Sequence, residues 1–173
     1  MSSNEVNVSV EYLKRRALED FIIENQKYLY RIAFSYVKSK DDAFEIVQNT
    51  IYKSLSSVEY IKDLNLLKPW ITRILVNNCI DFFKYNKKFI LSDEILKESA
   101  EDNSHILDKI VLKNAMDKLS PKLKAIIILR FFEDFKIKDI AQILEMNEST
   151  VKTNLYKALK ILKINLKEDL VNV

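Results

Sequence analysis

Polar and cationic side chains recur at steps of three and four residues between positions 149 and 160. On a helix this spacing places them on one face, opposite a stripe of valine and leucine. The residues of this face are Ser149, Thr150, Lys152, Thr153, Tyr156, Lys157 and Lys160. Hydroxyl and ammonium groups hydrogen-bond to base edges and neutralise phosphates, which is the chemistry of DNA binding. A lysine-rich helix face that simply meets solvent is the alternative interpretation.

A second helical pattern lies directly before this face. Ile137, Ile140 and Ile143 recur at helical spacing, and only residues 145–147 separate them from the next helix. Asn147 is a favourable N-cap for that helix. Two short helices joined by so tight a turn form a helix-turn-helix, whose second helix fits a DNA major groove. The paired helices therefore favour DNA binding over a solvated face.

The composition excludes most enzyme chemistry. The 173 residues include no glycine, which removes the glycine-rich loops that bind phosphates and dinucleotides. Cys79 and His105 are single residues of their types, so no disulfide, thiolate cluster, histidine-ligated metal site or catalytic triad can be assembled within this chain. We therefore expect no catalytic residue, no metal and no cofactor.

Hydrophobicity and patterning indicate a cytoplasmic all-α protein. The hydrophobic fraction of 48% is sufficient for a packed core, and no stretch alternates in the manner of a strand. The N-terminal segment lacks the basic-then-apolar order of a signal peptide, and no apolar run is long enough to cross a bilayer. We expect no membrane insertion.

Positive charge gathers at two separate places. Lys84, Lys87 and Lys88 close one helical segment, and Lys152, Lys157, Lys160 and Lys163 lie on the last helix. Residues 93–102 between them are acidic, and the net charge is only +3. This distribution predicts two contacts with an anionic polymer instead of one continuous cationic face.

The helical patterns divide the chain into two small bundles joined by a polar linker. We expect a tail at 1–17, a first bundle at 18–88, a linker at 89–105 and a second bundle at 106–168. The first bundle should contain helices at 18–37, from the Ser39 cap to about Ser57, and from Pro69 onward. In the second bundle, Ser120 and Pro121 should begin a helix with Phe131 on its apolar face.

Two motif sets make the chain resemble a bacterial sigma factor of the extracytoplasmic-function class. The segment LYRIAFSYVKSKDDAFEIVQNTI (29–51) and the following PWITRILVNNCIDFFKYNKK (69–88) resemble region 2 of that family. The segment 119–163, which ends in the helix-turn-helix, resembles region 4. The resemblance implies a non-catalytic subunit that binds core RNA polymerase and promoter DNA, and it also implies an anti-sigma partner.

The resemblance assigns the helix after Ser39 to polymerase docking. Asp42, Glu45, Gln48 and Asn49 would form its polar face, and Phe44 stands where an acidic residue is common in the family. Carboxylates in a first helical turn also complement the helix dipole, which is the alternative interpretation of the acidic pair.

The resemblance assigns the minus-ten element to the loop at 58–68 and the helix that follows it. Asn77 matches the asparagine that holds an extruded base, and Tyr60 and Lys62 belong to the loop that shapes its pocket. The expected backbone contacts are Arg73, Lys84, Lys87 and Lys88. Trp70 is interpreted as a core residue and not as a stacking platform.

Region 4 would read the minus-thirty-five element through the face at 149–160. The helix-turn-helix corner usually contains glycine, and here Glu145 must adopt the turn without that freedom. Two alternatives remain open: a helix-turn-helix regulator that acts without being a polymerase subunit, and a helical adaptor that binds no nucleic acid.

Overall fold

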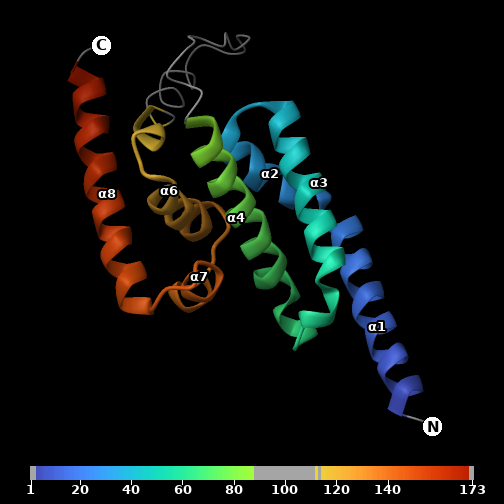
Figure 1. The fold of residues 1–173 in the computed structure, drawn as a ribbon. Coiled ribbons are helices and arrows are strands. Elements are labelled where there is room, and N and C mark those ends of the chain that lie inside the picture. Colours follow the sequence, from blue (N-terminus) through green and yellow to red (C-terminus); the bar gives the residue numbers. More distant parts are fainter. Residues whose placement is uncertain (1–2, 88–111, 113, 172–173) are drawn as a thin grey trace. The chain divides into compact units, whose positions relative to one another are not determined.

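The computed structural model describes residues 3–87, 112 and 114–171 (Figure 1). Among these residues the regular elements are helical and none is a strand, which confirms the expected all-α class. The chain divides into two compact units, Met1–Phe82 and Phe83–Val173. The predicted linker 89–105 lies outside the described residues, so the boundaries drawn around it stay predictions.

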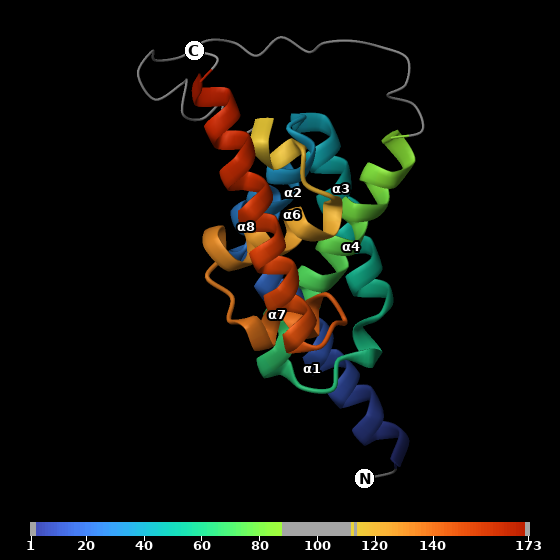
Figure 2. The same cartoon turned by 90° about the vertical axis from the view of Figure 1, so that its left-hand side faces the viewer.

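The first unit is a bundle of helices joined by short turns. Its elements are α1 (Ser3–Glu24), α2 (Gln26–Val37), α3 (Lys40–Ser56), the 3-10 turns η1 (Val58–Tyr60) and η2 (Leu64–Leu66), and α4 (Leu67–Lys87), which continues past Phe82. Helices α2 and α3 pack along each other, as Figures 1 and 2 both show. Apolar side chains at helical spacing form the core, as predicted; they include Leu29, Ile32, Ala43, Ile46, Ile71 and Leu75.

The N-terminal region differs from the prediction in two ways. The segment predicted as a tail, 1–17, is helical from Ser3 and forms most of α1. The helix predicted at 18–37 is interrupted at Asn25, whose side-chain amide donates to the Phe21 carbonyl at 2.9 Å and so competes with the helical ladder. Because Leu18 and Ile22 are buried, the end of α1 belongs to the bundle core.

Two helix starts in this unit were set by different signals. The Ser39 hydroxyl accepts a hydrogen bond from the Asp42 amide at 3.3 Å, which confirms the predicted N-cap of α3. The preceding helix ends at Lys38, which has a left-handed backbone with φ 60°. Helix α4 begins at Leu67, two residues before Pro69, because the Asp63 cap and η2 already start the winding.

The second unit has shorter helices. Residues 114–117 are helical and precede α6 (Pro121–Ile127), the π-helical turn η3 (Ile128–Phe132), α7 (Ile137–Ile143) and α8 (Glu148–Val171). Ser120 is the N-cap residue and Pro121 the first residue of α6, as predicted. Its core includes Leu123, Ile126, Leu129, Ile140 and Val151.

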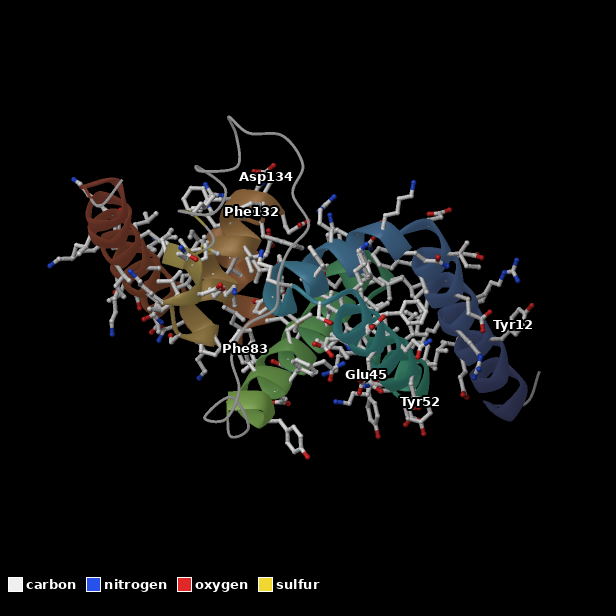
Figure 3. The ribbon with its side chains drawn as sticks, turned by 90° about the horizontal axis from the view of Figure 1, so that it is seen from above. Tyr12, Glu45, Tyr52, Phe83, Phe132 and Asp134 are labelled. Atoms are coloured by element: carbon white, nitrogen blue, oxygen red, sulfur yellow. The ribbon has the colours of Figure 1, made fainter. Side chains whose placement is uncertain are left out.

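The π turn corrects the prediction for Phe131. The Glu133 amide bonds to the Ile128 carbonyl five residues back, so each turn holds more residues than in an α-helix. The side chains after Ile128 are therefore rotated away from the α-helical register. Phe131 is 55% exposed instead of facing inward. The turn ends at Asp134, which has φ 54° and is labelled with Phe132 in Figure 3.

Candidate nucleic-acid and protein interfaces

The corner between α7 and α8 is closed by a Schellman motif without glycine. The Met146 amide donates to the Ala141 carbonyl at 2.9 Å, which is the six-to-one bond of that motif, and the Leu144 amide makes an ordinary helical bond to the Ile140 carbonyl at 2.9 Å. Glu145 occupies the left-handed position with φ 52°, which confirms that this residue makes the turn in glycine's place. Figures 1 and 2 both show the start of α8 beside α7, the arrangement of a helix-turn-helix.

Asn147 caps the start of α8, as predicted. Its side-chain oxygen accepts from the Thr150 amide at 2.7 Å and from the Ser149 hydroxyl at 2.8 Å. The Thr153 hydroxyl donates to the Ser149 carbonyl at 3.0 Å. Because these bonds engage backbone groups of the first turn, they hold the N-terminal end of α8 in one conformation.

The outer face of α8 presents every residue predicted to meet the minus-thirty-five element. Ser149, Thr150, Lys152, Thr153, Tyr156, Lys157 and Lys160 are all exposed. Tyr156, in the middle of this face, is 73% exposed. Lys163, which was not assigned to the face, is also exposed and continues it by one step of three residues. The surface combines hydroxyl donors near the helix start with ammonium groups farther along.

The buried stripe of α8 differs slightly from the predicted one. The predicted stripe consists of Val151, Leu155, Leu159 and Leu162. Val151 and Leu162 are buried, Leu155 is half-buried and Leu159 is 38% exposed, whereas Ala158 is buried. Val151, Ala158 and Leu162 recur at helical spacing and form the buried stripe, and Leu159 lies at its edge. Both α6 and α7 pack against this side of α8.

Helix α3 presents the polar face predicted for polymerase docking. Glu45, Gln48 and Asn49 are exposed, whereas Asp42 is half-buried beside the Ser39 cap. Two aromatic residues that sequence reasoning did not assign to docking, Phe44 and Tyr52, are exposed on the same helix. The side chains of Glu45 and Tyr52 point outward from α3 in Figure 3. The signal that was missed is Tyr52 four residues after Gln48, at a step that keeps it on the polar face.

The residues predicted for the minus-ten element fall along α4 and on the loop before it. Asn77 is exposed and Arg73, one turn earlier, is half-buried; Lys84 is exposed two turns later. Tyr60 and Lys62 are both exposed. The side chain of Lys87 and the whole of Lys88 lie outside the described residues.

The loop is braced by contacts that the sequence did not reveal. The Asp63 carboxylate accepts from the Asn65 amide at 2.9 Å and from its side chain at 3.0 Å, which shapes η2. The Lys14 ammonium of α1 donates to the Glu59 carbonyl in η1 at 3.0 Å. Ile61 is buried between the two turns and anchors the loop to the bundle. Trp70 is half-buried, compatible with its interpretation as a packing residue.

One titratable group of the first unit is strongly perturbed, and it belongs to the core. Burial raises the pKa of the Tyr36 hydroxyl well above its ordinary value, and the neighbouring Cys79 raises it further. The hydroxyl therefore stays protonated at neutral pH. Among the described residues no group of three metal-binding side chains is assembled, and no helix combines the length and apolarity needed to cross a membrane.

Comparison with protein families gives two matches in chain order. The family described as "Sigma-70 region 2" matches residues 21–89, and "Sigma-70, region 4" matches residues 109–162. The chain is 47% identical over 154 residues to RNA polymerase sigma factor SigV of Bacillus subtilis, covering 86% of this chain and 91% of the relative. It is 27% identical over 155 residues to the RNA polymerase sigma-E factor of Streptomyces coelicolor, covering 88% and 85%.

Two solved structures resemble the fold. The sigma factor RpoE of Bartonella quintana, crystallised with the anti-sigma factor NepR, has a TM-score of 0.67 and 26% identity, and the match covers 86% of this chain and 96% of that one. CnrH in complex with the cytosolic domain of CnrY has a TM-score of 0.70 over 94% of this chain and 96% of that chain. At 16% identity the second match bears on the fold alone.

Proposed function

The chain belongs to the sigma-70 family and is an alternative sigma factor that directs transcription initiation, and we propose that three of its surfaces divide this work. Helix α3 would dock on core RNA polymerase. The η1–η2 loop and α4 would capture bases of the minus-ten element, and α8 would read the minus-thirty-five element. The observation that carries the proposal is that each matched region presents an exposed polar face on a helix fixed by its own core.

Docking through α3 is supported by its charge and shape. Asp42 and Glu45 give the start of the helix two carboxylates, and Gln48 and Asn49 extend the face with amides. A cationic partner surface would be attracted from a distance and oriented before contact. Exposed Tyr52 adds apolar area at the far end of the same face, where water can be excluded.

Capture of the minus-ten element needs groups that recognise a base outside the duplex. The exposed amide of Asn77 can donate and accept at a base edge. The Tyr60 ring, on the braced loop, can stack on an unpaired base. Lys62, Arg73 and Lys84 supply positive charge for the backbone of the opened strand. Opening is favoured because the unstacked base exchanges its neighbours in the duplex for these contacts.

Reading of the minus-thirty-five element is assigned to α8 because the first residues of a recognition helix lie deepest in the major groove. Ser149, Lys152 and Thr153 occupy that end and are placed for base edges. Lys157 and Lys160 lie farther along and are placed for phosphates. We also infer an anti-sigma partner, supported by the complex with the anti-sigma factor NepR in which the Bartonella quintana relative was solved. We further propose that the chain acts in the cytoplasm, where bacterial RNA polymerase works.

The test is reconstitution with core RNA polymerase and a library of promoter fragments. The full chain should co-purify with the core enzyme and give transcription from promoters that the core enzyme alone does not use. Tight sequence-specific binding by the chain alone, unchanged by polymerase, would instead identify a regulator that is not a polymerase subunit. A chain that binds neither polymerase nor DNA would identify a helical adaptor.

A further inference from the structure

A chain of hydrogen bonds joins α3 to α4 in the first unit, running from the exposed Lys53 to the buried Asn78 and Thr50. The Lys53 ammonium donates to Oδ1 of Asn78 at 2.5 Å, and Nδ2 of Asn78 donates to Oγ1 of Thr50 at 2.9 Å. The Thr50 hydroxyl in turn donates to the Ile46 carbonyl at 2.8 Å. Asn78 is only 8% exposed and Thr50 is 0% exposed.

The direction of the bonds fixes the orientation of the Asn78 amide. An ammonium group only donates, so the amide oxygen must face Lys53, and the amide nitrogen then faces Thr50. The Thr50 hydroxyl can accept from that nitrogen because its own proton goes to Ile46. Each of the three bonds runs from a donor to an acceptor in this one orientation of the amide, so the bonds make a directed inter-helix contact.

Such a contact specifies the rotation of α4 more sharply than apolar packing does. Leu75 and Cys79 beside Asn78 are apolar, and apolar surfaces tolerate small rotations at little cost. A buried amide that leaves its partners loses directed hydrogen bonds, and the fully buried Thr50 hydroxyl loses a donor. Asn77 directly precedes Asn78, about 100° away round the helix, so the bonds that hold Asn78 inward also hold Asn77 at the surface.

We propose that Asn78 is a positioning residue that holds Asn77 at the angle needed to capture a minus-ten base. This inference rests on the proposed function of Asn77. The network also ties that angle to α3, since Thr50 directly follows Gln48 and Asn49 of the docking face. A sigma factor seated on polymerase through α3 would thereby present α4 to the opened strand in a fixed orientation.

The test compares Asn78→Leu with Ser54→Ala in reconstituted holoenzyme. Ser54 is also buried on α3, but its hydroxyl donates to the Ile51 carbonyl at 2.9 Å and so makes no bond to α4. For Asn78→Leu we expect unchanged affinity for core polymerase, promoter opening slower by about tenfold, and a weaker preference among bases at the captured minus-ten position. Ser54→Ala should match the parent in opening rate and base preference.

Opening is followed with a fluorescent base analogue in the minus-ten element, and base preference with forked templates that differ at one base. Unchanged opening and preference in Asn78→Leu would overturn the proposal. The proposal would also be overturned if Asn78→Leu lowered polymerase affinity, thermal stability and the opening rate on every template to a similar extent. Such a result would indicate a purely structural role. If Asn78→Leu does not fold, Thr50→Val removes the hydroxyl that accepts from Asn78 with a smaller change of side chain. It is compared with Ser54→Ala by the same criteria. A parent chain without polymerase-dependent opening would refute the proposed function as well.

Discussion

At position 145, a glycine variant should be more stable than an alanine variant, and at position 163 it should be less stable. Glu145 closes α7 in a left-handed conformation, with φ 52°, whereas Lys163 is an exposed residue within α8. The left-handed conformation brings a Cβ atom too close to the following carbonyl oxygen, and glycine has no Cβ. In an ordinary helical position glycine has only the disadvantage of its flexible unfolded state.

The comparison uses alanine as the reference at both positions, so that the loss of the native side chain beyond Cβ is common to both members of each pair. The Cβ strain is about 1–2 kcal/mol, and the flexibility of unfolded glycine offsets about 0.5–1 kcal/mol of the relief. We therefore expect Glu145→Gly to be more stable than Glu145→Ala by about 1 kcal/mol. Lys163→Gly should be less stable than Lys163→Ala by about 1 kcal/mol, so the two differences have opposite signs.

Stability is measured by chemical denaturation of the full chain with a helix-sensitive signal. Hydrogen exchange of the Met146 amide, which bonds to the Ala141 carbonyl, reports on the corner itself and should be slower in Glu145→Gly than in Glu145→Ala. A Tm change of roughly 4–8 °C per kcal/mol is expected for a unit of this size. If glycine is the less stable residue at both positions, the corner does not store backbone strain and the reasoning is wrong.

Three further outcomes test the proposed surfaces. Glu45→Lys should weaken binding to core polymerase by roughly threefold to tenfold at low salt. Glu24→Lys, which reverses an exposed charge on α1, should leave binding unchanged. Equal effects of the two variants would show that α3 is not the docking surface. Lys152→Ala should lose about 1–3 kcal/mol of promoter binding free energy and relax the preference at one base. Lys160→Ala should weaken binding to all upstream sequences alike and lower the slope of log affinity against log salt by about one unit. Unchanged base preference and salt slope in both variants would exclude α8 as the reader of the upstream element. Asn147→Ala should destabilise the start of α8 by about 1 kcal/mol, measured by denaturation, and Asn147→Asp should retain that stability; an alanine variant as stable as the parent would contradict the capping role.

Features that depend on neighbouring residues were predictable from the sequence. The caps at Ser39 and Asn147, the start of α6 at Pro121 and the unusual role of Glu145 were each anticipated and are present. These signals are local because a cap or a turn involves groups three to five residues apart. The exposed face of α8 belongs to the same class, since helical spacing alone brings its side chains together.

The order of the polar faces and the absence of catalytic histidine or cysteine clusters were likewise properties of the sequence. The tertiary structure decided how those faces are held. It joined Asn78 to Thr50 across 28 positions, attached the Lys14 ammonium of α1 to the Glu59 carbonyl, and exposed Phe131 through a π turn. The physical reason is that sequence periodicity shows which side of a helix is apolar and therefore buried. The rotation of the helix about its own axis is set by packing against partners that are distant in sequence and meet only in the folded core.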